Sequence, residues 1–234
     1  MVINELIQRS PIRIFERSIH GGLKAGEIGV IASQHGIGKT SVLVQLGLDK
    51  LLQGEKIIHV SFTQHSHYVL SWYEDIFDEF ISKKNLENSG DVKNEVVKNR
   101  VLMNFNQDGI SEETILKSLR AMIVEGCFAA QAIIIDGFDF SRTNGERIAT
   151  VKAFARELGL SVWYSLSVKD DSRQYDKQGI PLLIKDFSDL IDVVIVLAPK
   201  PDHIELSVSR DRDSRDTRAL SMRLDPKTLL ILEG

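Results

Sequence analysis

The sequence predicts an α/β fold in which a mainly parallel, twisted sheet is flanked by helices. Short apolar runs typical of buried strands alternate with segments that have helical spacing of apolar residues. A glycine-bearing loop joins the first of these runs, 28–32, to a helix that begins near Lys39. A later run, 132–135, ends in Asp136. Because strand, helix and strand follow one another, we expect parallel neighbours joined by right-handed crossovers.

Composition predicts a single folded domain over residues 1–234, since 43% of the residues are hydrophobic. No apolar run approaches the ~20 residues that cross a bilayer, and the acidic first residues do not resemble a secretory signal. The lone Cys127 cannot form an internal disulfide, which favours a cytoplasmic location. A net charge of -4 argues against capture of nucleic acid by the charge of the whole domain.

The pattern of apolar residues and turn signals places the elements in order. Residues 8–25 read as a loop that leads into the first core strand, because two glycines stand together there. Further strands are expected at 56–62, 101–105, 132–135, 161–168 and 190–197, and helices at 44–52, 69–81, 111–123 and 148–158. The polar stretch 83–99 is predicted to be a polar loop or a mobile helix end. The tail, 204–232, is predicted to form a C-terminal β extension.

The loop after the first strand has the residues of a phosphate cradle. Backbone N–H groups at a helix N-terminus lack intrahelical partners, and with the helix dipole they favour an anion. Lys39 would reach the outer phosphates, and Thr40 would offer its hydroxyl to a magnesium ion. The predicted nucleotide-binding residues are Ser33, Gln34, His35, Gly36, Ile37, Gly38, Lys39, Thr40 and Ser41.

Two features of this loop leave alternatives open. Ser33 holds the position of the first glycine in the G-x-x-x-x-G-K-[ST] pattern, and we count it as a tolerated variant. A glycine-rich turn that binds nothing is the alternative. His35 either contacts phosphate or a partner, or it points outward.

Asp136 is the second predicted anchor. The carboxyl ends of parallel strands face the crevice where ligands bind, so Asp136 should meet the cradle loop. Its carboxylate could hold magnesium opposite Thr40, directly or through water. The alternative is an Asp that only caps the following turn, and Asp139 is the weaker candidate. ATP and Mg²⁺ are therefore the predicted ligands.

These motifs resemble those of the RecA/KaiC/DnaB branch of P-loop ATPases. The resemblance rests on Gly21-Gly22-Leu23-x-x-Gly26-Glu27, the Walker A loop at 33–40 and the Walker B strand at 132–136, and it covers residues 12 to 230. KaiC-like and RadA-like proteins are the most similar, because the second strand ends in Val-Ser-Phe-Thr-Gln at 60–64. The resemblance implies a RecA-like core, ATP and magnesium binding, and a homo-oligomer in the form of a hexamer-like ring or a filament.

The resemblance also identifies a missing base. In the family, a Glu after this strand activates the water that attacks the γ-phosphate, and the matching residues here are Thr63 and Gln64. Gln64 could orient a water without accepting its proton. General-base help is typically worth ~10²–10⁴-fold, so we expect slow hydrolysis. His65 and His67 are weaker candidates for a base.

Four more positions follow from the resemblance. Ser165 or Ser167 matches a residue that senses the γ-phosphate. Arg210 and Arg212 match a Lys-x-Arg pair that reaches the nucleotide of the neighbouring subunit, so they join Lys39 and Gln64 as candidate catalytic residues. A solvated loop of mixed charge is the alternative for the arginines.

Three functions are compatible with these residues. The first is an ATPase or nucleotide-gated switch with weak hydrolysis. The second is a regulatory or scaffold protein that keeps the fold and does not hydrolyse ATP. A DNA recombination or helicase-type ATPase is a weaker third. Binding of a protein partner or of nucleic acid is left open.

Overall fold

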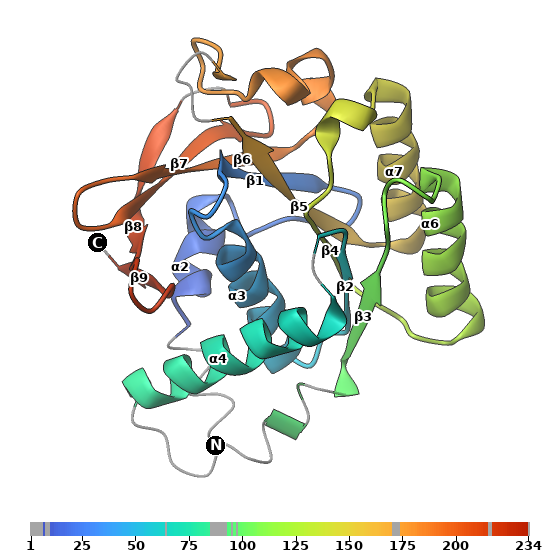
Figure 1. Cartoon of the computed structure of the whole chain (residues 1–234), viewed down its shortest axis with the longest axis horizontal. Coiled ribbons are helices and arrows are strands. Elements are labelled where there is room, and N and C mark those ends of the chain that lie inside the picture. The colour runs from blue at the N-terminus through green and yellow to red at the C-terminus, as the bar shows by residue number, and fades with distance from the viewer. Residues whose placement is uncertain are drawn as a thin grey trace.

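The structure, a computed structural model, describes residues 7, 10–63, 65–84, 93–94, 96, 98–169, 174–214 and 217–233 (Figure 1). Gln64 and most of the stretch 83–99, predicted to be a polar loop or a mobile helix end, lie outside the described residues. The described backbone at 93, 94, 96 and 98 is helical, and Val96 is buried. That part is therefore helical, as in the helix-end alternative, and differs from a loop.

The described strands form one nine-stranded sheet in the order β3-β2-β4-β5-β1-β6-β7-β8-β9. They span β1 Ile28–Gln34, β2 Ile57–Ser61, β3 Arg100–Asn104, β4 Ala132–Asp136, β5 Ser161–Val168, β6 Val193–Pro199, β7 Ile204–Asp211, β8 Arg218–Leu224 and β9 Ile231–Glu233. The first six pair in parallel, and β7, β8 and β9 continue the sheet antiparallel. This confirms the α/β class, the mainly parallel sheet and the C-terminal β extension.

Helices cover both faces of this sheet (Figure 1). One hydrophobic cluster joins α2, α3 and α4 to one face, and a second joins α6, α7 and the 3₁₀ helix η4 to the other. The bounds are α2 Pro11–Ser18, α3 Lys39–Leu52, α4 Ser66–Lys84, α6 Glu112–Arg120, α7 Gly145–Leu158 and η4 Leu182–Leu190. A π-helical turn, Ala121–Glu125, extends α6, and a short 3₁₀ turn, Phe140–Arg142, precedes α7.

Most helix ends follow the predicted signals. Ser111 caps α6 by accepting a hydrogen bond from the Thr114 N–H, and Gly159, in the left-handed region, ends α7. The predicted loop at 8–25 is wrong in its central part, since α2 forms there with Pro11 in its first turn. Its buried residues, Ile12 and Phe15, and the following Ile19 repeat at helical spacing, so packing onto α3 and the extension stabilises this short helix.

The strand order brings distant segments to one edge of the sheet. The cradle loop follows the carboxyl end of β1, and Asp136 ends β4, with β5 between them. Ser61 at the end of β2 lies opposite Asp136, whose carbonyl accepts a 2.9 Å hydrogen bond from the Phe62 N–H. The predicted cradle residues, Asp136 and Thr63 therefore share this edge.

Candidate functional site

Two glycines shape the loop between β1 and α3. Gly36 and Gly38 have φ of +79° and +104°, in the left-handed region that residues with a Cβ rarely adopt. A Cβ on Gly38 would also lie 2.6 Å from Leu224 Cδ2. Gly38 immediately precedes α3 and supplies no capping side chain. The first turn of α3 therefore faces the loop with backbone donors that no N-cap side chain satisfies.

Lys39 folds back into this loop. Its side-chain ammonium donates to the carbonyl oxygens of Gln34, at 2.7 Å, and of Ser33, at 3.2 Å, and it lies 3.3 Å from the Ser33 hydroxyl. Burial lowers the pKa of Lys39 to about 8, although the nearby Asp136 carboxylate raises it. The loop thus holds one buried cation at the start of a helix, where an anion is favoured.

Thr40 and Asp136 meet as the sequence predicts. The Thr40 hydroxyl donates a 2.8 Å hydrogen bond to Asp136 Oδ2, and Asp136 is only 3% exposed. Among the described residues, there is no group of three or more His, Cys, Asp or Glu side chains that could hold a metal. A cation at the Thr40–Asp136 pair would therefore need further oxygen atoms from a ligand or from water.

The ends of β2 and β5 complete the edge beside Asp136. The Gly137 N–H donates a 2.8 Å hydrogen bond to the hydroxyl of Ser165, which is buried, whereas Ser167 is exposed. A Cβ on Gly137 would lie 2.5 Å from Thr63 Oγ1, so Thr63 stands directly next to the end of β4. Of the two predicted sensing residues, Ser165 is the one in contact with this strand end.

The remaining loop residues differ in exposure. Ser33 is fully buried, and its hydroxyl donates to the Gln34 carbonyl at 3.0 Å. His35 is exposed, and Ile37 is half-buried. Ser33 therefore fits the position of the missing glycine, and its hydroxyl lies on the Lys39 side of the loop.

The C-terminal extension contacts the cradle helix, which sequence reasoning missed. The Leu229 carbonyl accepts hydrogen bonds from the Ser41 hydroxyl and, at 2.9 Å, from the Gln45 side chain. The Gln45 side-chain oxygen in turn accepts from the Ile231 N–H at 2.8 Å. The turn between β8 and β9 is thus fixed to the first two turns of α3. No local pattern predicts this contact, because it joins opposite parts of the chain.

Arg210 and Arg212 lie at the other edge of the sheet. Asp211 pairs with Val193, and Val193 pairs with Gly29, so this end of β7 adjoins the beginning of β1. Arg210 is buried and donates to Asp189 at 3.2 Å. The structure does not bring these arginines to the cradle loop of the same chain.

Arg212 is held on all sides within its own chain. Its guanidinium donates to both Glu27 carboxylate oxygens at 2.9 and 2.8 Å, and to Asp211 at 2.7 Å. It also donates to the carbonyls of Ile19 and Gly22 at 3.0 and 2.7 Å. Arg212 therefore fixes the segment before β1 to the end of β7.

A buried pair of polar side chains on β2 and α4 was also not predicted from the sequence. His59 of β2 is fully buried, and its Nδ1 lies 3.1 Å from the Tyr73 hydroxyl of α4. Within the described part of the chain its Nε2 has no hydrogen-bond partner. Burial lowers the pKa of His59 to about 4. Tyr73 fits because its neighbour on α3 is Gly47, where a Cβ would lie 2.5 Å from the hydroxyl. The pair joins α4 to the strand that leads to Thr63.

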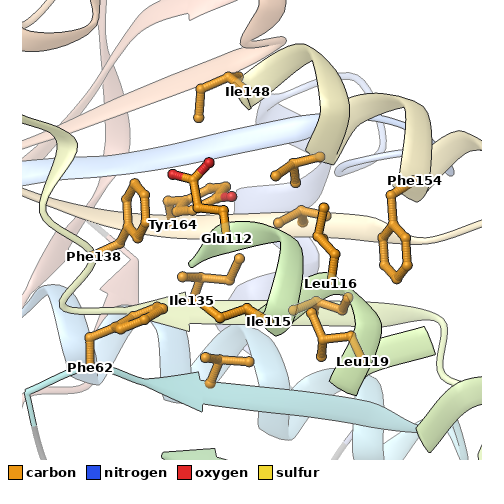
Figure 2. A pocket seen from close by; sticks show the side chains of 14 residues that line it. Phe62, Glu112, Ile115, Leu116, Leu119, Ile135, Phe138, Ile148, Phe154 and Tyr164 are labelled. Atoms are coloured by element: carbon orange, nitrogen blue, oxygen red, sulfur yellow. The ribbon is translucent and has the colours of Figure 1, made fainter. Parts of the chain in front are cut away.

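A separate apolar cavity of about 30 Å³ lies beneath α6 and α7, on the sheet face opposite α3 (Figure 2). Glu112 is the one charged residue among the described residues that line it, and burial raises the pKa of its carboxyl. Figure 2 shows this carboxylate above Tyr164, among apolar side chains. The cavity offers no cationic group to a phosphate and is not part of the cradle.

Comparison with protein-family models and with curated proteins found no match. None of the described helices combines the length and the apolar composition that a membrane span requires. The assignment of function therefore rests on the residues at the carboxyl edge of the sheet.

Proposed function

We propose that the chain is an ATP- and magnesium-binding P-loop protein of the RecA/KaiC type, which acts as a weak ATPase or as a nucleotide-gated switch. The observation that carries this proposal is the 2.8 Å hydrogen bond from Thr40 to Asp136, beside the buried ammonium of Lys39. A hydroxyl and a carboxylate fit a hard cation that also binds phosphate oxygens. When bound, the magnesium ion would neutralise charge on the phosphates.

The residues at the strand ends support weak rather than rapid hydrolysis of ATP. Thr63 occupies the edge next to Gly137, and its hydroxyl cannot act as a general base at neutral pH. The same observation favours the second candidate, a regulatory or scaffold protein that binds ATP without cleaving it. A DNA recombination or helicase-type ATPase has only the family resemblance in its favour, and the net charge of -4 weighs against it.

We also propose that the protein assembles with itself in the cytoplasm, as a hexamer-like ring or a filament with nucleotide at the subunit contacts. Arg210 and Arg212 would then act on the neighbouring subunit. Their place at the edge remote from their own cradle is compatible with such a role. Arg212 would have to exchange its internal hydrogen bonds for contacts with phosphate.

Calorimetric titration with ATP, with and without magnesium, tests the proposal directly. We expect binding that requires magnesium and is lost in Lys39→Ala. Phosphate release and size-exclusion measurements on the same samples report turnover and assembly. Failure of the wild-type chain to bind ATP would reject the proposal, and turnover at the rate of ordinary ATPases would reject the non-hydrolysing alternative.

A further inference from the structure

An open groove of about 480 Å³ runs along the outer side of α4, next to the edge that carries Thr63. Four helical positions that line it, 68, 71, 72 and 75, follow the spacing of one helix face. The lining residues are Thr63, His65, Tyr68, Ser71, Trp72 and Asp75. None of them takes part in the Lys39 or Thr40 contacts of the cradle.

Aromatic rings cluster beside this groove, near the first residues of α4. Tyr68 is 56% exposed, a large exposure for a side chain of this kind. The His67 ring lies 4.0 Å from the Tyr68 ring and stacks on His65 at 5.9 Å between centroids. The open face of Tyr68 attracts cations electrostatically, and aromatic residues with one wet side are enriched at protein interfaces.

The charge of α4 is of one sign over most of its length. Residues 66–82 include Glu74, Asp75, Asp78 and Glu79 and contain no Lys or Arg. Asp78 pairs with Lys93 at 3.4 Å, whereas no ion pair of Asp75 is found among the described residues. Asp75 is exposed and lines the groove. A carboxylate on the same helix face as aromatic rings selects a planar cation.

We propose that this groove binds an arginine-bearing segment of a partner protein. A guanidinium can stack on Trp72 while it donates two hydrogen bonds to Asp75, one turn away, and a second arginine can stack on the exposed Tyr68 ring. An ammonium cannot reproduce this combination. The carboxylates of α4 repel a phosphate backbone, which disfavours nucleic acid. The inference goes beyond nucleotide binding and does not depend on it.

A second copy of the chain is a poorer occupant if it docks through its arginines between 210 and 218. Its described arginines between 210 and 218 are held internally: Arg210 by Asp189, Arg212 by Glu27 and Asp211, and Arg218 by Asp211 and the Ser18 carbonyl. Docking through them would break these contacts. A partner with a free arginine meets no such cost.

Fluorescence anisotropy of a labelled hexa-arginine peptide, titrated with the whole chain at about 0.1 M salt, tests the proposal. We expect saturable binding that is tighter than that of a hexa-lysine peptide. Asp75→Asn and Tyr68→Ala should each weaken it about two- to fivefold, from the loss of an exposed ion pair or a cation–π contact. Both positions are exposed, so the fold should persist, as circular dichroism can verify.

Glu146→Gln is the matched control, because it changes the net charge equally at an exposed position outside the groove. It should leave the affinity unchanged. Equal weakening by Glu146→Gln, or unchanged binding by the Asp75→Asn/Tyr68→Ala double variant, would overturn the proposal. So would binding of a 20-nucleotide oligothymidine, or self-association in sedimentation, that these two substitutions abolish.

Discussion

The Thr40 hydroxyl donates a 2.8 Å hydrogen bond to Asp136 although the two residues stand 96 positions apart. The contact forms because α3 begins at the carboxyl end of β1 and Asp136 ends β4, so both reach one edge of the sheet. It links the residue that follows the cradle lysine to a buried carboxylate. The consequences can be tested one at a time.

Asp136→Asn should remove the magnesium dependence of ATP binding. The amide keeps the shape of the side chain but loses the negative charge that attracts the cation. We expect ATP affinity in magnesium to fall about 10-fold or more, to the level seen with EDTA. Asp139→Asn, an exposed neighbour that pairs with Arg142, is the control and should bind as the wild type does. Full magnesium dependence in Asp136→Asn would contradict this assignment.

Affinity for ATP should fall as the pH rises through about 8, the pKa to which burial lowers Lys39 from 10.5. Only the protonated ammonium attracts phosphate, so above this pKa the affinity can drop by up to about tenfold per pH unit. Titrations at pH 7, 8 and 9 measure the effect. Lys39→Arg stays charged throughout and should show a flat profile. A wild-type affinity that is constant from pH 7 to 9 would rule out this explanation.

Thr63→Glu should accelerate ATP hydrolysis. Thr63 touches the end of β4 beside Asp136, and a carboxylate there would supply the missing base. General-base help is worth ~10²–10⁴-fold at best, and we expect at least about 10-fold in an unevolved site. Thr63→Gln has a similar shape and no base, so it controls for bulk. Equal phosphate release by the Glu and Gln variants would show that this position does not face the attacking water.

Arg212→Ala should lower the free energy of unfolding by about 2–4 kcal/mol. It leaves the Glu27 carboxylate without its cation, whereas Asp211 keeps its ion pair with Arg218. This remaining pair and the 21% exposure of the Arg212 side chain reduce the loss below that of a fully buried pair. Urea unfolding measures it, with the exposed Arg17→Ala as control. A stable Arg212→Ala that has lost only ATP-dependent assembly would instead favour a role in the neighbouring subunit.

Stability should fall as the pH drops from 6.5 toward 4, because burial lowers the pKa of His59 to about 4. In this window the unfolded chain takes up a proton on His59 that the folded chain does not, which can remove roughly 3 kcal/mol. The double variant His59→Leu/Tyr73→Phe removes both partners and should flatten this limb of the urea-unfolding profile. Tyr73→Phe alone should retain it, and loss of the limb in that single variant would point to another group.

Local signals predicted the strand, loop and helix at residues 28–52 well. An apolar strand, glycines in a loop and the Lys39-Thr40 start of a helix lie within one short segment, and their geometry follows from nearby backbone preferences. Asp136 was predictable because the carboxyl ends of parallel strands share an edge. The helical spacing of Ile12, Phe15 and Ile19 also indicated α2. The two adjacent glycines nevertheless led to the prediction of a loop.

Other features depend on which strands become neighbours. The Arg212–Glu27 ion pair and the Gln45–Leu229 hydrogen bond join residues 185 and 184 positions apart. Sequence reasoning therefore assigned Arg212 only by resemblance and missed Gln45 entirely. His59 reads as one polar residue in an apolar strand, and nothing local shows that Tyr73 would bury its hydroxyl against it.

The hydrogen bond from the Ser41 hydroxyl to the Leu229 carbonyl can form only late in protein synthesis. The two residues are 188 positions apart, so at 5–20 residues per second the ribosome needs about 10–40 s to travel from one to the other. During that interval the nascent chain can form β1 and α3, but Ser41 and Gln45 lack their acceptor. The cradle helix should therefore acquire its final surroundings only after translation has passed the turn between β8 and β9.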